Sequence, residues 1–324
     1  MRALIPVAGF GSRLRPHTFT VPKVLLNVAG KPIIGHILDK IIEDGFTEAT
    51  IIVGYLGEKV REYVQSHYSI RVDFIEQPEA KGLAHAIYLA KETINHEPIL
   101  IILGDTIFDV NLKPVLKEKH TAIGVKEVSD PRRFGVVELK DGFAKHLIEK
   151  PEQPTSNLAI VGLYWIRNPK LLISSIDELF KKNQMTKGEF QLTDALELML
   201  KQGEKIKTFS VDGWYDCGKP ETLLATNRHL LEKMQHSVKI KDVVIIPPVY
   251  VAKSATILHS VIGPFATIAD RASVSDSIIR NSIVSEDAQV HQAVLEDSLV
   301  GVNALVEGTF NRINIGDSSE IEFH

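Results

Sequence analysis

VAGFGSRLRPHTFTVPKV, residues 7–24, joins two glycines to three arginine or lysine side chains and contains no acidic residue. It follows a short apolar run at residues 3–7, which is typical of a β-strand. Backbone N–H groups can approach an anion closely where no Cβ intervenes, so the glycines can form a nest for phosphate oxygens. Arg13 adds a fork of donors and Lys23 adds a mobile point charge. The stretch therefore predicts an anion-binding loop after the first strand, with a tight turn carrying surface cations as the alternative.

The glycine spacing excludes two familiar phosphate loops. The dinucleotide fingerprint G-x-G-x-x-G needs a small third residue, but Leu14 stands at that position after Gly9 and Gly11. The P-loop G-x-x-x-x-G-K-[ST] is excluded because both Gly-Lys pairs, residues 30–31 and 218–219, are followed by proline. What remains is the pattern Gly-x-Gly-Ser-Arg.

Outward from this loop, apolar runs alternate with amphipathic stretches up to about residue 235. The runs that predict strands are residues 3–7, 50–53, 99–103, 121–125, 136–139 and 158–166. Stretches with apolar residues at helical spacing lie between the early runs, at residues 33–44, 57–67 and 83–94. This alternation indicates an α/β sandwich of Rossmann-like type around a mixed, mostly parallel sheet. Such sheets bind ligands where the carboxyl ends of strands meet the following loops.

The C-terminal part of the chain follows a different period. Residues 221–235 predict a linking helix, and from residue 243 short aliphatic positions recur about every six residues, with small residues between them. These positions are Ile245, Val251, Ile257, Ile262, Ile268 and Val274, followed in a drifting phase by Ile278, Val284, Val290, Leu295 and Val300. The spacing predicts a parallel β-helix, with a small antiparallel β-domain as the alternative. We therefore expect an α/β domain at residues 1–235, which the first loop would make the functional one, and a β-helix domain at residues 236–324.

Charge, hydropathy and cysteine content argue against several classes of partner and of chemistry. The 324 residues carry a net charge of −4 with a pI near 6.3, which argues against nucleic acid as a partner. No signal-peptide pattern opens the chain, and the densest apolar run, residues 98–103, is too short to cross a bilayer. The single cysteine, Cys217, excludes an intrachain disulfide and has no Cys–His signature around it, so we expect it to be structural. We expect a cytoplasmic protein with no membrane partner.

The stretch AGFGSRLRPHTFTVPKVLLNVAGKPII, residues 8–34, resembles the signature of the sugar nucleotidyltransferases, in particular the glucose-1-phosphate thymidylyltransferase and uridylyltransferase group. Many of these enzymes carry a C-terminal left-handed β-helix, which residues 260–268 also resemble. The resemblance implies the reaction NTP + sugar 1-phosphate → NDP-sugar + pyrophosphate, by in-line attack without a protein nucleophile. It implies catalytic roles for Arg13 and Lys23. The nucleotide-binding residues that it implies in this loop are Ala8, Gly9, Gly11, Ser12 and Arg13.

Two aspartates match the metal-binding positions of this family. Asp105 follows an apolar run at residues 99–104, and Asp216 lies in GWYDCG, residues 213–218. The resemblance implies that both hold Mg²⁺, which prefers hard carboxylate and phosphate oxygens. A turn or helix cap is the alternative for a lone aspartate. Thr106 stands where the family commonly has asparagine, which leaves the metal ligand intact.

The stretch EQPEAKGLAHAI, residues 76–87, resembles the family segment that binds the base. A glutamine side chain offers an acceptor and a donor, so Gln77 can pair with the imide edge of thymine or uracil, while Gly82 lets the backbone approach the ring. The resemblance therefore favours dTTP or UTP over purine nucleotides, without separating the two pyrimidines. A polar loop that caps a helix beginning at Leu83 is the alternative.

The sugar-phosphate site is implied by residues 130–139 and 148–165. By resemblance Gly135 and Glu149 contact sugar hydroxyls and Lys150 holds the phosphate, with glucose 1-phosphate favoured. An exposed ion pair is the alternative for Glu149 and Lys150. Residues 187–196 also match, and we expect Thr193 and Asp194 there only to cap a helix.

Three functional interpretations follow. The first is a pyrimidine-dependent sugar-1-phosphate nucleotidyltransferase, expected to form a homo-oligomer. The second is a catalytically inert regulatory or binding subunit, which the presence of Arg13, Lys23, Asp105 and Asp216 argues against. The third is a bifunctional enzyme whose β-helix transfers acyl groups, for which His259 and His291 are the only histidines in the expected coils.

Overall fold

The computed structural model describes residues 1–234 and 238–308, and the chain divides into two compact units, Met1–Thr226 and Asn227–His324. The division falls within helix α7 (Pro220–Lys233), earlier in the chain than the expected domain boundary at residue 235. The helix expected as a linker therefore contributes residues to both units. Residue 235, the expected end of the first domain and of the linking helix, lies outside the described residues, as do residues 236–237 and 309–324 of the expected β-helix domain.

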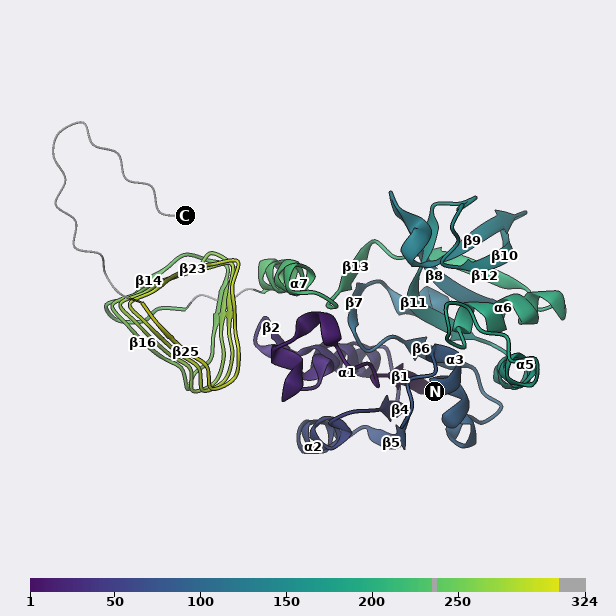
Figure 1. Ribbon diagram of the computed structural model, residues 1–324, viewed down its shortest axis with the longest axis horizontal. Helices are drawn as coiled ribbons and strands as arrows, with labels where there is room; N and C mark the ends of the chain where they lie inside the picture. Colours follow the sequence, from purple (N-terminus) through teal and green to yellow (C-terminus); the bar gives the residue numbers. More distant parts are fainter. Residues whose placement is uncertain (235–237, 309–324) are drawn as a thin grey trace. The chain divides into compact units, whose positions relative to one another are not determined.

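The N-terminal half of the first unit builds the parallel part of a nine-stranded sheet (Figure 1). Strand β1 (Arg2–Pro6) lies at its centre and pairs in parallel with β4 (Glu48–Val53) and β6 (Ile99–Ile102), and β5 (Arg71–Glu76) follows β4. Ala3, Leu4 and Ile5 are fully buried because layers cover both faces of this strand. The loop after β1 therefore starts at the middle of the sheet, at its carboxyl edge.

The other half of the sheet is mixed in direction. Strand β11 (Leu158–Ile166) runs antiparallel to β6 and also pairs with two further strands. The strands of this half, besides β11, are β8 (Thr121–Glu127), β9 (Gly135–Lys140), β10 (Phe143–Glu149) and β12 (Ile206–Ser210). Only β12 and β8 are parallel there. A separate antiparallel ribbon, β7 (Thr106–Asp109) with β13 (Gly213–Asp216), stands beside the sheet. The expected α/β class with a mixed sheet is confirmed.

Helices cover both faces of the sheet. The helices are α1 (Ile33–Glu43), α2 (Gly57–His67), α3 (Leu83–Leu89), α4 (Leu112–Val115), α5 (Pro169–Lys181) and α6 (Leu192–Lys201). Residues of α3, α5 and α6 share one core with the strands, including Leu4, Ile101 and Tyr164. Figure 1 shows α1 and α2 on the other side of β1. Both helical layers form because apolar residues recur at a spacing of three to four.

Helix α3 is shorter than expected from residues 83–94. It ends at Leu89, and a 3₁₀ turn, η4 (Lys91–Thr93), follows. The Thr93 hydroxyl donates to the Ala90 carbonyl at 2.8 Å. The Thr93 amide donates to the same carbonyl at 2.9 Å, so both bonds belong to the tighter turn that follows the helix.

The second unit is a parallel β-helix with three faces. The first sheet contains β14 (Val244–Ile245), β17 (Val261–Ile262), β20 (Ile278–Arg280) and β23 (Val294–Glu296). The second contains β15 (Val249–Val251), β18 (Ala266–Ile268), β21 (Ile283–Val284) and β24 (Leu299–Val300). The third contains β16 (Thr256–Leu258), β19 (Ser273–Ser275), β22 (Gln289–His291) and β25 (Leu305–Glu307). All pairs between them are parallel. The expected β-helix is confirmed, and the antiparallel alternative is wrong.

Buried serines connect successive coils at their corners. The Ser277 amide donates to the Ser260 hydroxyl at 3.1 Å, 17 residues apart, and the Ala293 amide donates to the Ser277 hydroxyl at 3.1 Å, 16 residues apart. Ser260 and Ser277 in turn donate to carbonyls of their own coil. The change from 17 to 16 residues per coil explains the drifting phase of the aliphatic positions.

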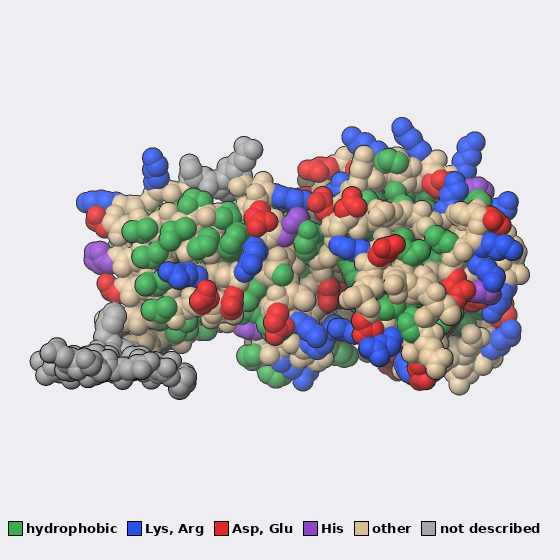
Figure 2. Space-filling model, turned by 90° about the horizontal axis from the view of Figure 1, so that it is seen from above, with side chains coloured by type: hydrophobic (Ala, Val, Ile, Leu, Met, Phe, Trp, Pro, Cys, Tyr) green, Lys and Arg blue, Asp and Glu red, His purple; other side chains and the backbone are tan. Residues whose placement is uncertain are grey.

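One outer face of the β-helix is apolar. Val244, Val261, Ile278 and Val294 occupy the same outward position of successive strands in the β14-β17-β20-β23 sheet, and Val294 is 76% exposed. Figure 2 shows hydrophobic side chains gathered on this face, with few charges among them. Within the described residues, no helix is long and apolar enough to span a membrane.

Candidate active site

Glycine occupies positions 9 and 11 of the first loop for different structural reasons. Gly11 has φ +62°, and a Cβ there would lie 3.0 Å from Thr18 Cγ2 and 3.1 Å from Lys23 Cβ. Thr18 also donates its hydroxyl to the Gly11 carbonyl at 2.9 Å. Gly9 differs, because a Cβ at that position would have no atom within 4 Å. Packing therefore explains Gly11, whereas Gly9 keeps space open beside the backbone.

All the nucleotide-binding residues implied by the resemblance line one hollow of about 520 Å³, here called the loop cleft. They are Ala8, Gly9, Gly11, Ser12, Arg13, Gln77 and Gly82. Lys23, Asp105 and Lys150 line it as well. The carboxyl ends of β1, β5 and β6 lead into these residues, as expected for this type of sheet.

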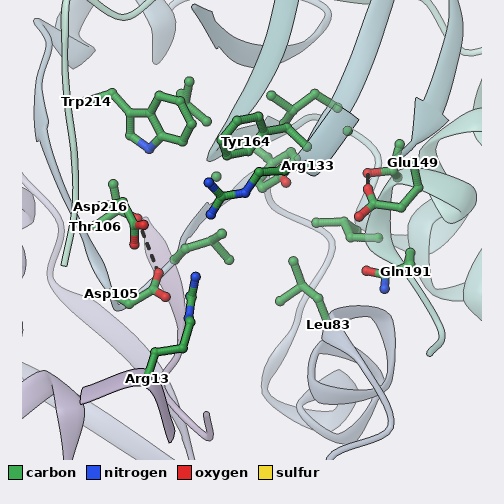
Figure 3. A pocket seen from close by; sticks show the side chains of 18 residues that line it. Arg13, Leu83, Asp105, Thr106, Arg133, Glu149, Tyr164, Gln191, Trp214 and Asp216 are labelled. Atoms are coloured by element: carbon green, nitrogen blue, oxygen red, sulfur yellow. Dashed lines mark hydrogen bonds between the residues drawn. The ribbon is translucent and has the colours of Figure 1, made fainter. Parts of the chain in front are cut away.

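A second hollow of about 260 Å³, the inner pocket, contains Gly135 and Glu149 of the expected sugar site (Figure 3). Tyr164 and Trp214 add aromatic walls, and Trp214 packs edge-on against Phe134 with ring centroids 4.9 Å apart. The inner pocket shares four residues with the loop cleft: Arg13, Leu83, Leu103 and Asp105. The two hollows therefore meet at a boundary that carries one cation and one carboxylate.

Lys150 does not line the inner pocket with Gly135 and Glu149. Its Nζ lies 3.3 Å from Glu149 Oε1, but the side chain turns toward the loop cleft and a neighbouring basic recess. That recess is lined by Arg13, Arg132, Arg133, Lys150, Pro151, Glu152 and Lys187. Sequence reasoning missed Arg132, Arg133 and Lys187 as site residues, although all three lie in stretches that match the family.

Asp105 and Asp216 come together through the β7–β13 ribbon. Asp216 pairs with Thr106 in its register, and the Cys217 amide donates to the Asp105 carbonyl at 3.0 Å. A Cβ on Gly218 would lie 2.8 Å from both Arg13 Nη2 and Asp216 Oδ1, so these two side-chain ends lie on either side of Gly218 and would have to shift for a larger residue. Figure 3 shows Asp105, Asp216 and Arg13 on one side of the inner pocket.

This pair of carboxylates fits a magnesium ion that also binds phosphate oxygens. Among the described residues, no group of three or more His, Cys, Asp or Glu side chains is placed to hold a metal alone. Mg²⁺ is usually bound by one or two carboxylates with substrate phosphates and water. Asp105 and Asp216 supply that number of hard ligands beside the loop cleft.

Lys23 is not the mobile point charge that the sequence suggested. It is buried, and its Nζ lies 2.7 Å from Asp105 Oδ2. Burial alone would raise the pKa of Asp105, but the charge and hydrogen bond of Lys23, together with hydrogen bonds from Thr106 and the backbone, hold this pKa below its usual value. The Thr106 hydroxyl also donates to Asp105 Oδ1 at 3.2 Å. Asp105 is therefore a charged, oriented carboxylate before any ligand arrives.

The amide of Gln77 is held by its own segment of chain. Its Nε2 donates to the Gly82 carbonyl at 3.2 Å and lies 3.1 Å from His85 Nδ1. A Cβ on Gly82, which has φ +104°, would lie only 2.4 Å from the Phe190 carbonyl oxygen. That Gln77 binds a base stays a prediction; in this structure its amide nitrogen is engaged within the chain, which leaves Oε1 as the acceptor for a ligand.

Thr193 holds the carboxylate of Glu149. Its hydroxyl donates to Glu149 Oε2 at 2.6 Å, and a Cβ on Gly135 would lie 2.7 Å from the same hydroxyl oxygen. Thr193 and Asp194 do not cap helix α6 as expected: the cap residue is Gln191, which makes no side-chain cap bond, and Asp194 accepts from Thr186. Thr193 is thus a site residue that sequence reasoning dismissed.

Cys217 is fully buried next to Asp216. Burial raises the pKa of its thiol to about 12, and its Sγ lies 3.6 Å from the Thr226 hydroxyl. At neutral pH the group is a thiol and not a nucleophilic thiolate. The structure therefore supports a structural role.

A family model described as nucleotidyl transferase matches residues 2–233. The chain belongs to the nucleotidyl transferase family. The match covers the sheet, both helical layers and every residue of the two hollows. The resemblance stated for residues 8–34 is confirmed.

Three similar proteins illustrate this family. The bifunctional protein GlmU of Methanocaldococcus jannaschii is 36% identical over 330 residues, covering 94% of this chain and 78% of that protein. A glucose-1-phosphate thymidylyltransferase of Streptomyces antibioticus is 30% identical over 359 residues, covering 99% of each chain. Among solved structures, a UDP-glucose pyrophosphorylase complexed with UDP-glucose matches this nucleotidyl transferase with a TM-score of 0.61 and 27% identity, covering 72% of this chain and 99% of that one.

Proposed function

We propose that this sugar nucleotidyltransferase transfers a nucleotidyl group from dTTP or UTP to a sugar 1-phosphate, with glucose 1-phosphate as the preferred acceptor. The observation that carries the proposal is the shared boundary of the two hollows, where Arg13 and Asp105 line both. Transfer between two bound phosphates needs such a junction. The names of the relatives, which include glucose-1-phosphate thymidylyltransferase and UDP-glucose pyrophosphorylase, support the choice of substrates.

In this proposal the triphosphate lies along the loop cleft and the sugar lies in the inner pocket. Gly9 admits a phosphate oxygen close to the backbone, and Arg13 donates to phosphates at the boundary. Glu149, oriented by Thr193, accepts hydrogen bonds from sugar hydroxyls. Lys150 and the basic recess lie where they can hold negative phosphate oxygens.

The proposed chemistry needs no protein nucleophile. An oxygen of the sugar 1-phosphate attacks the α-phosphorus, and the bond to the β-phosphate bridging oxygen breaks, releasing pyrophosphate. Mg²⁺ held by Asp105 and Asp216 would neutralise phosphate charge. The protein's part is to align the two phosphates and to stabilise the charge that develops during transfer, with Arg13 as the principal donor.

Gly9 offers a test of where the triphosphate lies. We expect Gly9→Ala to raise the KM for the nucleotide about tenfold, because hydrogen bonds to charged groups contribute roughly 1.5–3 kcal/mol and the added methyl would block the approach. The thermal midpoint should stay unchanged, since the new Cβ meets no protein atom. Steady-state kinetics and a thermal melt measure both. Gly11→Ala is the contrast, expected to lower the midpoint through its close contacts and positive φ. An unchanged KM in Gly9→Ala would place the triphosphate elsewhere.

The proposed function is tested by pyrophosphate release from the purified protein with magnesium. Each of dTTP, UTP, CTP, ATP and GTP is combined with glucose, galactose, mannose and N-acetylglucosamine 1-phosphates. We expect release with dTTP or UTP and glucose 1-phosphate. Release only with a purine nucleotide would contradict the proposed base, and no release from folded protein would favour an inert binding subunit.

A further inference from the structure

The side chain of Gln77 presents only one polar atom to the loop cleft. Gln77 is buried, and its Nε2 faces the Gly82 carbonyl oxygen and His85 Nδ1. Its Oε1 makes no hydrogen bond with any residue in the described ranges 1–234 and 238–308, although the residue lines the cleft. An amide has two N–H hydrogens, and these two partners use both. A ligand in the loop cleft would therefore find only a hydrogen-bond acceptor, Oε1, on the Gln77 side chain.

The neighbouring groups determine the protonation of His85. A backbone carbonyl only accepts, so the atom of Gln77 that faces Gly82 must be the amide nitrogen. His85 Nδ1 must then accept the second hydrogen, which requires a neutral ring with its proton on Nε2. Burial lowers the pKa of His85 and Lys81 lowers it further, while Glu79 raises it, with a net shift below the usual value. This shift favours the neutral ring that the hydrogen bond requires.

We propose that His85 is a positioning residue for nucleobase specificity: by accepting one amide hydrogen of Gln77, it keeps Oε1 as the only group of that side chain directed at the base. The inference rests on the proposed function and names the chemical feature that the site selects. That feature is a ring N–H donor on the edge of the base. His85 acts through Gln77 and does not itself contact the base.

The pyrimidines differ at the atom that would meet this acceptor. Uracil and thymine carry a hydrogen on N3 and can donate to Gln77 Oε1. Cytosine has a lone pair at N3, so two acceptors would face each other and one polar atom would lose its partner on desolvation. A glutamine free to turn its amide could serve either base. Specificity for N3–H therefore depends on the two groups that hold the amide, and of these only His85 is a side chain that can be exchanged.

The test compares matched nucleotide pairs in His85→Phe. Phenylalanine retains an aromatic ring near Phe180, whose centroid lies 6.1 Å from that of His85, but removes the acceptor. We measure kcat/KM and, by calorimetry, Kd for UTP against CTP and for dTTP against dCTP. The preference for UTP or dTTP should fall about fivefold or more in each measurement, as expected for loss of one buried hydrogen bond.

His85→Asn is the conservative variant, because its Oδ1 can accept near the position of Nδ1. It should restore most of the preference, which a merely structural role would not predict. If His85→Phe weakens the binding and turnover of both nucleotides in a pair equally, so that the preference for UTP over CTP is unchanged, the inference is overturned. Failure of His85→Asn to restore that preference would overturn it as well. If the wild type binds UTP or dTTP selectively but turns over no sugar phosphate, the proposed function fails, and the Kd ratios of the variants still decide the role of His85.

Discussion

Replacing Asp105 by asparagine is expected to lower kcat by at least about a hundredfold at saturating substrate, because a bound metal contributes several kcal/mol of charge stabilisation. The amide keeps the shape of the side chain but loses the negative charge that would hold Mg²⁺ against the triphosphate. Lys23 should remain in place, since the amide oxygen can still accept from its Nζ, which lies 2.7 Å from Oδ2 in the native protein. A magnesium titration of the rate, with circular dichroism to verify the fold, measures the effect.

Asp141→Asn is the matched control for this substitution. Asp141 is exposed in the turn between β9 and β10 and has φ +52°, a conformation that asparagine adopts readily. Its activity should equal that of the wild type. Retained activity of Asp105→Asn at low magnesium would remove Asp105 from the metal site.

Arg13→Ala is expected to reduce kcat about a hundredfold to a thousandfold, the range observed when one preorganised donor to a developing charge is removed. Arg13 lines the loop cleft, the inner pocket and the basic recess alike. Its guanidinium has no ion pair or hydrogen-bond partner among the described residues, so it is available to a ligand. For the same reason the fold should not depend on it, and the thermal midpoint should stay within a degree or two.

Arg15→Ala controls for the loss of a cation from the same loop. Arg15 lies over the ring of Phe19 at 4.9 Å and lines none of the three hollows. We expect nearly full activity from this variant. Arg13→Lys should recover only part of the rate, because lysine keeps the charge without the bidentate fork. Equal rates for Arg13→Ala and Arg15→Ala would refute the special role of Arg13.

Much of the fold could be predicted because the sequence patterns that indicate it span only short stretches of the chain. Alternating strand and helix patterns in the first 235 residues identified the α/β class, and the recurring aliphatic positions identified the β-helix. The direction of β11 could not be predicted, because a fully buried run such as residues 158–166 has the same pattern in parallel and antiparallel pairs. The end of α3 at Leu89 could not be predicted either, because residues 91–93 continue the helical apolar pattern as a 3₁₀ turn.

The site was predictable as a set of residues but not as a set of contacts. The stretches that match the family contain most of the residues that line the two hollows. The ion pair of Lys23 with Asp105 spans 82 residues of sequence, and the bond of Thr193 to Glu149 spans 44, so no local pattern reports either. Those contacts decide that Lys23 is fixed and that Glu149 is oriented. The engaged amide of Gln77 likewise depends on His85, whose ring nitrogen has no signature in the sequence.

The serine hydroxyls that connect the coils of the β-helix have an evolutionary consequence. Each described coil contributes one strand to every sheet, and Ser260 and Ser277 each accept a hydrogen bond from an amide at the start of the coil that follows. Coils of 17 and of 16 residues stack with their strands in register, so one residue can be gained or lost at a corner, and gain or loss of a whole coil also preserves the interior positions. The described coils of the β-helix can therefore change in number during descent, by duplication or deletion of a whole coil, or in length by one residue at a corner, while the residues of the loop cleft and the inner pocket stay the same.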